Sequence, residues 1–228
     1  YPKVRHYMAP LDQESDDKPL SKAGHKREAT KAALIEAFES LIAEEGVAAV
    51  GVNAVAKRAG VGKPLIYKYF DGFDGLVAAW ASQSKIWGDD DDIFAPLSQN
   101  PSADPIAVMR DTLVKSSTEL REKPVALQIM AHALLGGSEL TAGLEAAKQE
   151  SGNHHDALYE QGGVFDDPDT SALLLVMYAA SRYLALRSLS QSNFNGVPLD
   201  TPDGWSAMMD MMTTVFDNAV HGAKVKNG

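Results

Sequence analysis

Apolar residues recur along most of the chain at three- and four-residue intervals, the spacing of one face of an α-helix. The first stripe consists of Leu34, Ile35, Phe38, Leu41 and Ile42. This helix is predicted to run from Lys26, and Gly46 is a typical helix stop. Residues 1–24 mix Pro, Asp, Lys and Ser without a helical or strand period, which predicts a flexible N-terminal arm.

The same spacing predicts further helices in the rest of the chain. Between Val52 and Phe70, two short helices are separated by Gly60-Val61-Gly62. Longer helices are predicted at residues 74–87, 106–122, 124–135, 139–161, 169–190 and 204–223. Because no segment shows the alternating pattern of a strand, we predict an all-α fold.

The break at Gly60 has the residues that a helix-turn-helix needs. Its two helices cross steeply through a short connection, so one contact residue must be small and the turn must tolerate positive φ. Ala56 and Gly60 meet these requirements, and Pro64 suits the first turn of the second helix. The positions predicted to face the first helix are all apolar: Val55, Ala59, Val61 and Ile66.

The distribution of charge supports a role for this segment in binding an anion. The whole chain carries a formal net charge of −10, which is unusual for a protein that contacts phosphates. Residues 21–70, however, hold eight basic and five acidic residues, a balance of +3 that leaves −13 for the remainder. The basic segment is therefore predicted to face the anion, unless the clustering is accidental.

The segment from Val52 to Phe70 resembles the DNA-binding signature of the TetR (tetracycline repressor) family. The resemblance covers about sixty residues, from Lys26 to roughly Lys85, and is strongest in the Ala-Gly-Val turn and the Tyr67-x-Tyr69-Phe70 ending. It implies a three-helix DNA-binding domain at residues 25–72, with its motif at about 51–70. A helical-bundle ligand-binding and dimerisation domain would follow at residues 73–228.

Position by position, the resemblance implies which side chains face the major groove or the phosphates beside it. These are Lys63, Pro64, Leu65, Tyr67, Lys68 and Tyr69. Lysines and phenols can donate to phosphates or base edges, and Pro64 and Leu65 can touch a thymine methyl group. Alternatively, the tyrosines pack in the core and the lysines are merely solvated.

Other positions are expected to extend or weaken this contact. Asn53, Lys26 and Arg27 are further candidates for DNA binding. The family often has Ser or Thr at the two motif-helix starts and a Lys after the aromatic ending. This chain has Gly51, Gly62 and, after the aromatic ending, Phe73 in these regions, so those phosphate contacts are expected to be missing. Phe70 is expected to pack in the core against Phe38.

The helical remainder predicts a homodimer. The segment from Asp169 to Ser190 is apolar nearly all round, which indicates burial on more than one face. A second apolar stripe runs along the last predicted helix, residues 204–223. This helix and the helix at residues 169–190 together resemble the dimerising pair of the family. A twofold dimer would place two recognition helices one DNA turn apart. The alternative is a monomeric core.

A sensor also needs a pocket lined by adaptable apolar groups and a few polar ones. The candidates are Trp87, Phe94, Met109, Leu113, Met130, His132, Met177, Tyr178 and Arg182. Each could instead be ordinary core. Arg182 is the most informative, because an arginine within an apolar helix must find an anion, either a protein carboxylate, which we favour, or an acidic ligand.

The sequence contains no motif that would support catalysis, a metal or a cofactor. It has no G-x-S-x-G or H-E-x-x-H motif, and Gly60-Val61-Gly62-Lys63 lacks the first glycine and the Ser or Thr of a phosphate loop. The absence of cysteine and of a long apolar run fits a cytoplasmic protein. We therefore predict a transcriptional regulator, most simply a repressor released from operator DNA by a small-molecule effector, although activation is possible. A helical adaptor that binds protein is the alternative.

Overall fold

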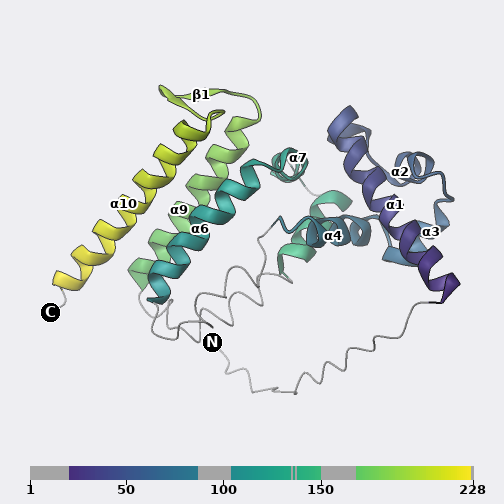
Figure 1. The fold of residues 1–228 in the computed structure, drawn as a ribbon, viewed down its shortest axis with the longest axis horizontal. Helices are drawn as coiled ribbons and strands as arrows, with labels where there is room; N and C mark the ends of the chain where they lie inside the picture. Colours follow the sequence, from purple (N-terminus) through teal and green to yellow (C-terminus); the bar gives the residue numbers. More distant parts are fainter. Residues whose placement is uncertain (1–20, 87–103, 135, 137, 150–167, 227–228) are drawn as a thin grey trace, which may run out of the picture.

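The computed structural model describes residues 21–86, 104–134, 136, 138–149 and 168–226. These residues are helical except for turns and one short hairpin, which confirms the predicted all-α class (Figure 1). The helices are α1 (Lys22–Glu45), the 3₁₀-helix η1 (Val47–Ala49), α2 (Val52–Arg58), α3 (Pro64–Phe70), α4 (Phe73–Gln83), α6 (Pro105–Arg121), α7 (Pro124–Ala133), residues 139–149, α9 (Pro168–Ser188) and α10 (Pro202–Lys226). The hairpin pairs β1 (Asn193–Phe194) with β2 (Val197–Pro198).

Helix α1 begins earlier than its apolar stripe predicts. The Ser21 hydroxyl accepts a hydrogen bond from the Gly24 backbone N–H at 3.1 Å, which caps the helix. Residues 22–24, assigned to the arm from sequence, are therefore helical, whereas residues 1–20 lie outside the described part of the chain. Gly46, with φ of +82°, ends the helix as predicted.

The hairpin is the element that helical periodicity did not reveal. Asn195 and Gly196 both have positive φ, at 51° and 91°, and Asn-Gly is the preferred pair for a two-residue hairpin turn. The antiparallel pairing joins Asn193 to Pro198 and Phe194 to Val197. Each strand has two residues, too few to show an alternating pattern.

Helices α1 to α4 share one apolar core. Leu34, Ile42, Val55 and Ile66 are completely buried in it. The Phe38 ring packs against Phe73 and Trp80, with ring centroids 6.0 and 5.4 Å away. Phe70, expected to pack in the core against Phe38, is partly buried against the same cluster, while the rings that pair with Phe38 are those of Phe73 and Trp80. The difference arises because Phe73 and Trp80 lie on α4, whose position relative to α1 depends on tertiary packing.

The remaining long helices form a bundle beside this unit. Helices α6, α9 and α10 run side by side (Figure 1). Buried side chains form a second apolar cluster between them: Leu113, Leu174, Met177, Phe216 and Val220. An ion pair of 2.6 Å between the Arg110 guanidinium and Asp217 also joins α6 to α10, and Asp217 raises the pKa of Arg110. No helix among the described residues is long and apolar enough to span a lipid bilayer.

Helix α4 packs against elements from both parts of the chain. It contacts α1 and α3, and the Lys123 ammonium group, at the start of α7, donates to the carbonyls of Ser84 and Lys85 just after α4. A Cβ atom added to Gly143, in the helix of residues 139–149, would lie 2.3 Å from the Asp74 carbonyl oxygen. Because that neighbour is backbone, only glycine allows this helix to cross α4 at such a close distance.

We expect Gly143→Ala to destabilise the protein by about 1–3 kcal/mol, because the added methyl group must separate two packed helices. Ala142→Ser is the matched control, since Ala142 is an exposed neighbour in the same helix. Urea denaturation followed by circular dichroism measures both variants. Equal free energies of unfolding for the two variants would contradict the close packing.

Candidate nucleic-acid interface and sensor site

The turn between α2 and α3 has the predicted geometry. Gly60 lies in the left-handed region with φ of +66°, and Ala56 is buried with 4% of its surface exposed. The Val61 N–H donates to the Ala56 carbonyl at 3.0 Å, which closes the turn. The roles predicted for Ala56 and Gly60 in forming this turn are therefore confirmed.

Helix α3 divides its side chains between the core and solvent. Ile66 is completely buried in the core shared by α1 to α4, while Leu65 is only partly buried. The exposed side chains are those of Lys63, Pro64, Tyr67 and Lys68. Lys63 and Tyr67 are four residues apart, as are Pro64 and Lys68, so the four side chains share one face of the helix. The result is an outward face that carries two ammonium groups and a phenol.

Tyr69 links this helix to the beginning of α1. Its partly buried ring lies under the Arg27 guanidinium at 5.7 Å and under the Lys68 ammonium at 5.8 Å. Each cation can interact favourably with the face of the ring. The predicted DNA-binding residues Arg27, Lys68 and Tyr69 thus lie together, at the junction of α1 and α3.

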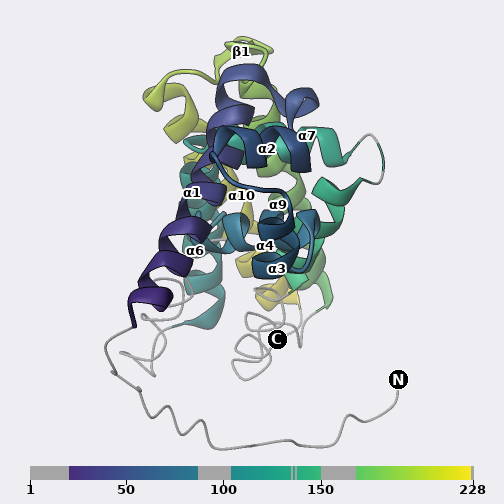
Figure 2. The ribbon, with the colours of Figure 1, turned by 90° about the vertical axis from the view of Figure 1, so that its right-hand side faces the viewer.

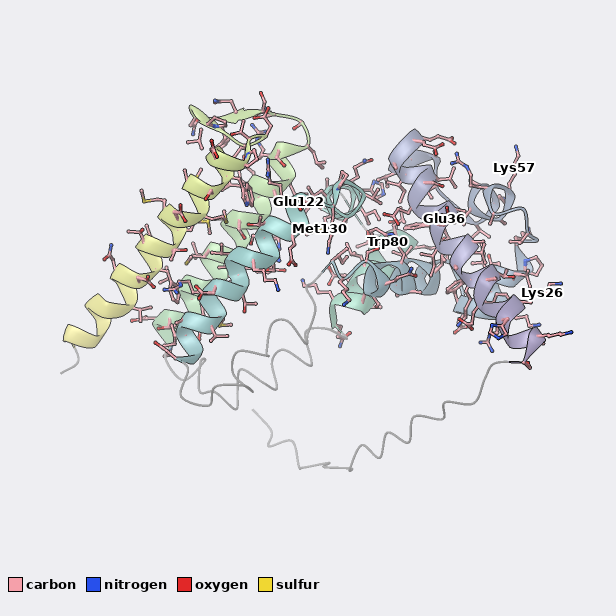
Figure 3. The ribbon with its side chains drawn as sticks, viewed as in Figure 1. Lys26, Glu36, Lys57, Trp80, Glu122 and Met130 are labelled. Atoms are coloured by element: carbon pink, nitrogen blue, oxygen red, sulfur yellow. The ribbon has the colours of Figure 1, made fainter. Side chains whose placement is uncertain are left out.

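Further polar residues lie near the same end of the molecule. Helices α1, α2 and α3 face the viewer together in Figure 2, and the side chains of Lys26 and Lys57 point outward in Figure 3. Lys26 and Asn53, both predicted to bind DNA, are exposed. Lys57, at the end of α2, and Lys22, at the start of α1, are exposed cations that the predicted site omitted. The capping residue Ser21 is the signal that could have placed Lys22 on the helix.

Arg58 has a different role from its basic neighbours. Its guanidinium forms ion pairs with Glu44 at 2.8 Å and Glu45 at 2.6 Å, which fasten α2 to the end of α1. These partners are partly exposed, so each pair contributes only modest stability. One positive charge of the basic segment, that of Arg58, is nevertheless neutralised within the protein itself.

The structure also describes the three positions at which this chain departs from the pattern expected from the resemblance: Gly51, Gly62 and Phe73. Gly51 is the residue that precedes α2, and no side chain caps that helix. At α3 the capping position belongs to Lys63 rather than Gly62, again without a side-chain hydrogen bond. Phe73 is buried in the core. None of Gly51, Gly62 and Phe73 therefore offers a side-chain donor to a phosphate.

The structure divides the candidate sensor residues into two groups. Met109, Leu113, Met177 and Tyr178 pack together in or against the second apolar cluster. Met130 packs against the larger core shared with α1 to α4, and His132 is exposed on α7. Trp87 and Phe94 lie outside the described residues. Only the first group is thus brought together by the fold, and His132 is exposed to solvent.

Arg182 adjoins this first group. It is 7% exposed, and its Nη1 donates to the Ser117 hydroxyl at 3.3 Å. Its guanidinium lies 4.4 Å from the centre of the Tyr178 ring, and its Nε has no acceptor. No carboxylate of the described residues forms an ion pair with it, so the partner favoured from sequence is not found in this part of the chain. The described residues also contain no cluster of acidic and histidine side chains that could hold a metal ion.

Comparisons with known proteins place these features in context. The family model described as bacterial regulatory proteins, tetR family, matches residues 34–80, which include α2, α3, the second half of α1 and most of α4. A TetR-like transcriptional regulator from Rhodococcus sp. RHA1 has a similar structure, with 17% identity, a TM-score of 0.53, and coverage of 89% of this chain and 99% of that chain. A second transcriptional regulator from Rhodococcus sp. Rha1 has 19% identity, a TM-score of 0.55, and coverage of 82% and 95%. A search of curated proteins found no match.

Gly60→Ala is expected to destabilise the protein by about 1–2 kcal/mol, because an L-residue must then adopt the left-handed conformation. Nothing lies within 4 Å of the added Cβ, so the loss reflects backbone strain rather than a clash. Gly62→Ala is the matched control, since Gly62 has no positive φ and its Cβ would make only an ordinary contact. Calorimetry measures both, and an equal melting temperature for the two variants would refute the strain.

Proposed function

We propose that this chain is a member of the tetR family of bacterial regulatory proteins, and that it is a repressor that binds operator DNA as a homodimer and is released by a small-molecule effector. The main observation behind the proposal is that α3, which follows the turn at Gly60, exposes Lys63, Tyr67 and Lys68 on one face. Such a regulator is a binding protein and not an enzyme. Because its partner is chromosomal DNA, its place is the cytoplasm.

The exposed face of α3 suits the major groove. Lys63 and Lys68 supply positive charge for phosphates or guanine edges, and Tyr67, which is 56% exposed, supplies a hydroxyl. Pro64 and Leu65 offer apolar contact to thymine methyl groups. Lys26, Arg27 and Asn53 lie on α1 and α2, where they can reach the flanking backbone. The concentration of positive charge at this end compensates for the acidic remainder of the chain.

The dimer is supported by apolar surface on α9 and α10. On α9 the exposed residues form a continuous helical stripe: Ala172, Leu175, Val176, Ala179, Ala180 and Tyr183. On α10, Met211 and Val215 are also largely exposed. The two helices are in contact, and a second copy that packs against them would cover these apolar side chains.

Helix α4 is the element through which we propose that the effector acts. DNA contact belongs to residues 25–72 and ligand response with dimerisation to residues 73–228, and α4 packs against both parts. Lys123 and Gly143 connect the bundle side of the protein to α4, and α4 follows directly after α3. A ligand that shifts the bundle can therefore change the separation of the paired α3 helices and their fit to DNA.

Lys63→Ala and Lys68→Ala should each weaken binding to a duplex selected from random sequence with the wild-type protein. If each lysine contacts one phosphate, the slope of log affinity against log salt concentration should fall by about 1. Lys148→Ala is the control, because Lys148 is exposed on the helix of residues 139–149. Fluorescence anisotropy over a salt series provides the measurement.

Unchanged slopes for both lysine variants would contradict phosphate contact by α3. If the wild-type protein failed to bind any duplex at low salt, the DNA-binding proposal itself would fall and a protein-binding adaptor would be favoured. Circular dichroism of each variant checks that the helices remain folded.

Val176→Glu and Val215→Glu should dissociate the dimer, because each places a charge in the apolar surface where the side chains are 63% and 51% exposed in the single chain. Ala146→Glu is the control, at an exposed position on the helix of residues 139–149. Sedimentation velocity should give monomers for the first two variants and dimers for the control. A wild-type monomer, or dimers of all three variants, would disprove this interface.

A further inference from the structure

The most deeply buried arginine of the described residues has no counter-ion among them. Arg58 and Arg110 are each paired with two carboxylates, although both are more exposed than Arg182. The Arg182 guanidinium remains positively charged under all physiological conditions. Burying such a charge without an anion is strongly unfavourable, which indicates a partner that the described residues do not supply.

The groups around Arg182 form a polar site within an apolar layer. Ser117 and Ser181, both completely buried, place their hydroxyl oxygens 3.0 Å apart. Ser117 donates to the Leu113 carbonyl and Ser181 to the Tyr178 carbonyl, so backbone acceptors occupy their protons. Arg182 donates to Ser117 and covers the Tyr178 ring, but its Nε is left without an acceptor. The Arg182 guanidinium therefore lacks a negatively charged hydrogen-bond acceptor at this site.

The side chains beside this site are apolar and adaptable. The second apolar cluster includes Leu113 and Met177, and Tyr178 packs against it. Leu113 lies one turn before Ser117 on α6, and Met177 and Tyr178 lie on α9 with Arg182. Met109 and Met212 also pack against it. Methionine is unbranched and flexible, so such a cluster can rearrange around a ligand more easily than one of branched residues.

We propose that the effector is a small organic carboxylate with an apolar body, whose charged end pairs with Arg182. This inference rests on the proposed function, because it assigns a chemical class to the ligand that releases the operator. One guanidinium neutralises one carboxylate, and its planar fork can hold both oxygens. The apolar body packs against Met177 and Leu113 in place of existing contacts.

The same site connects to α4 through a short path. Ser117 lies on α6 six residues before Lys123, whose ammonium holds the two carbonyls after α4. An anion that draws the Arg182 guanidinium away from Ser117 changes the contact between α9 and α6. Displacement of the end of α6 is then passed to Lys123 and from there to α4.

The test uses acetate, benzoate, octanoate and decanoate, together with the corresponding neutral amides, as probes of the full-length protein. Melting temperatures are measured for the wild type, Arg182→Met and Arg182→Gln in carboxylate-free buffer and over a series of probe concentrations. The matched control is Arg187→Met, because Arg187 also lies on α9 above aromatic rings, those of Tyr183 and Phe194.

We expect at least one carboxylate to raise the melting temperature of the wild type and of Arg187→Met, with no effect from its amide. Both Arg182 variants should bind that carboxylate with an affinity at least about tenfold lower than that of the wild type, since they lose a charge-assisted pair. The proposal is overturned if no carboxylate distinguishes the wild type from the Arg182 variants, or if the amides stabilise the protein as well as the acids.

Operator binding by the same proteins separates this inference from the proposed function. If a neutral compound releases the wild type from its operator while no carboxylate binds through Arg182, the repressor proposal stands and the anionic effector is refuted. If a carboxylate binds through Arg182 without weakening the operator complex, the anion site is supported and its role in release is refuted.

Discussion

The packing of Phe38 against Phe73 and Trp80 is the contact on which the arrangement of the molecule depends. It buries three aromatic rings between α1 and α4, and burying one such side chain contributes about 1.5–3 kcal/mol. Since α3 packs against α4, the same contact helps to set the orientation of α3. Trp80 lies on the part of α4 that approaches the bundle, so one apolar core serves both the turn at Gly60 and its attachment to the remaining helices (Figure 3).

This shared core provides a route by which the proposed ligand domain can influence the short helix α3. Helix α3 has only seven residues and cannot move independently of α4, which follows it closely. Gly143 brings a bundle helix into backbone contact with α4, and Lys123 holds the carbonyls just after it. One is a contact between packed backbones and the other involves a partly buried charge, and such contacts transmit a displacement better than flexible surface side chains do.

Charge is distributed to match two different tasks. At the exposed end of the molecule, lysines on α1, α2 and α3 offset the acidity of the chain where DNA is proposed to bind. Inside the bundle, the single charge of Arg182 lies beside apolar side chains. A buried charged group that lacks part of its hydrogen bonding lowers the stability of a protein, and such groups are commonly functional. The exposed apolar stripe on α9 is a similar departure from the ordinary surface pattern.

The sequence by itself determined the helices, the turn and the general nature of the interface. Helical periodicity, the small Ala56 and the positive φ of Gly60 are local properties, since they depend on residues within a few positions of one another. Lys63, Tyr67 and Lys68 could be assigned to one face of α3 for the same reason. Among the described residues, the boundaries of some helices, the 3₁₀-helix Val47–Ala49 and the short hairpin at Asn195 were missed, because a cap, a single turn or a two-residue strand leaves little periodic signal.

The tertiary structure decided the partners of individual side chains. It placed Phe73 and Trp80, rather than Phe70, against Phe38, and it neutralised Arg58 with Glu44 and Glu45. It separated Met130 from Met177 and left Arg182 buried beside a serine, an aromatic ring and no described carboxylate. These outcomes could not be obtained from spacing, because each depends on how helices distant in sequence pack against one another.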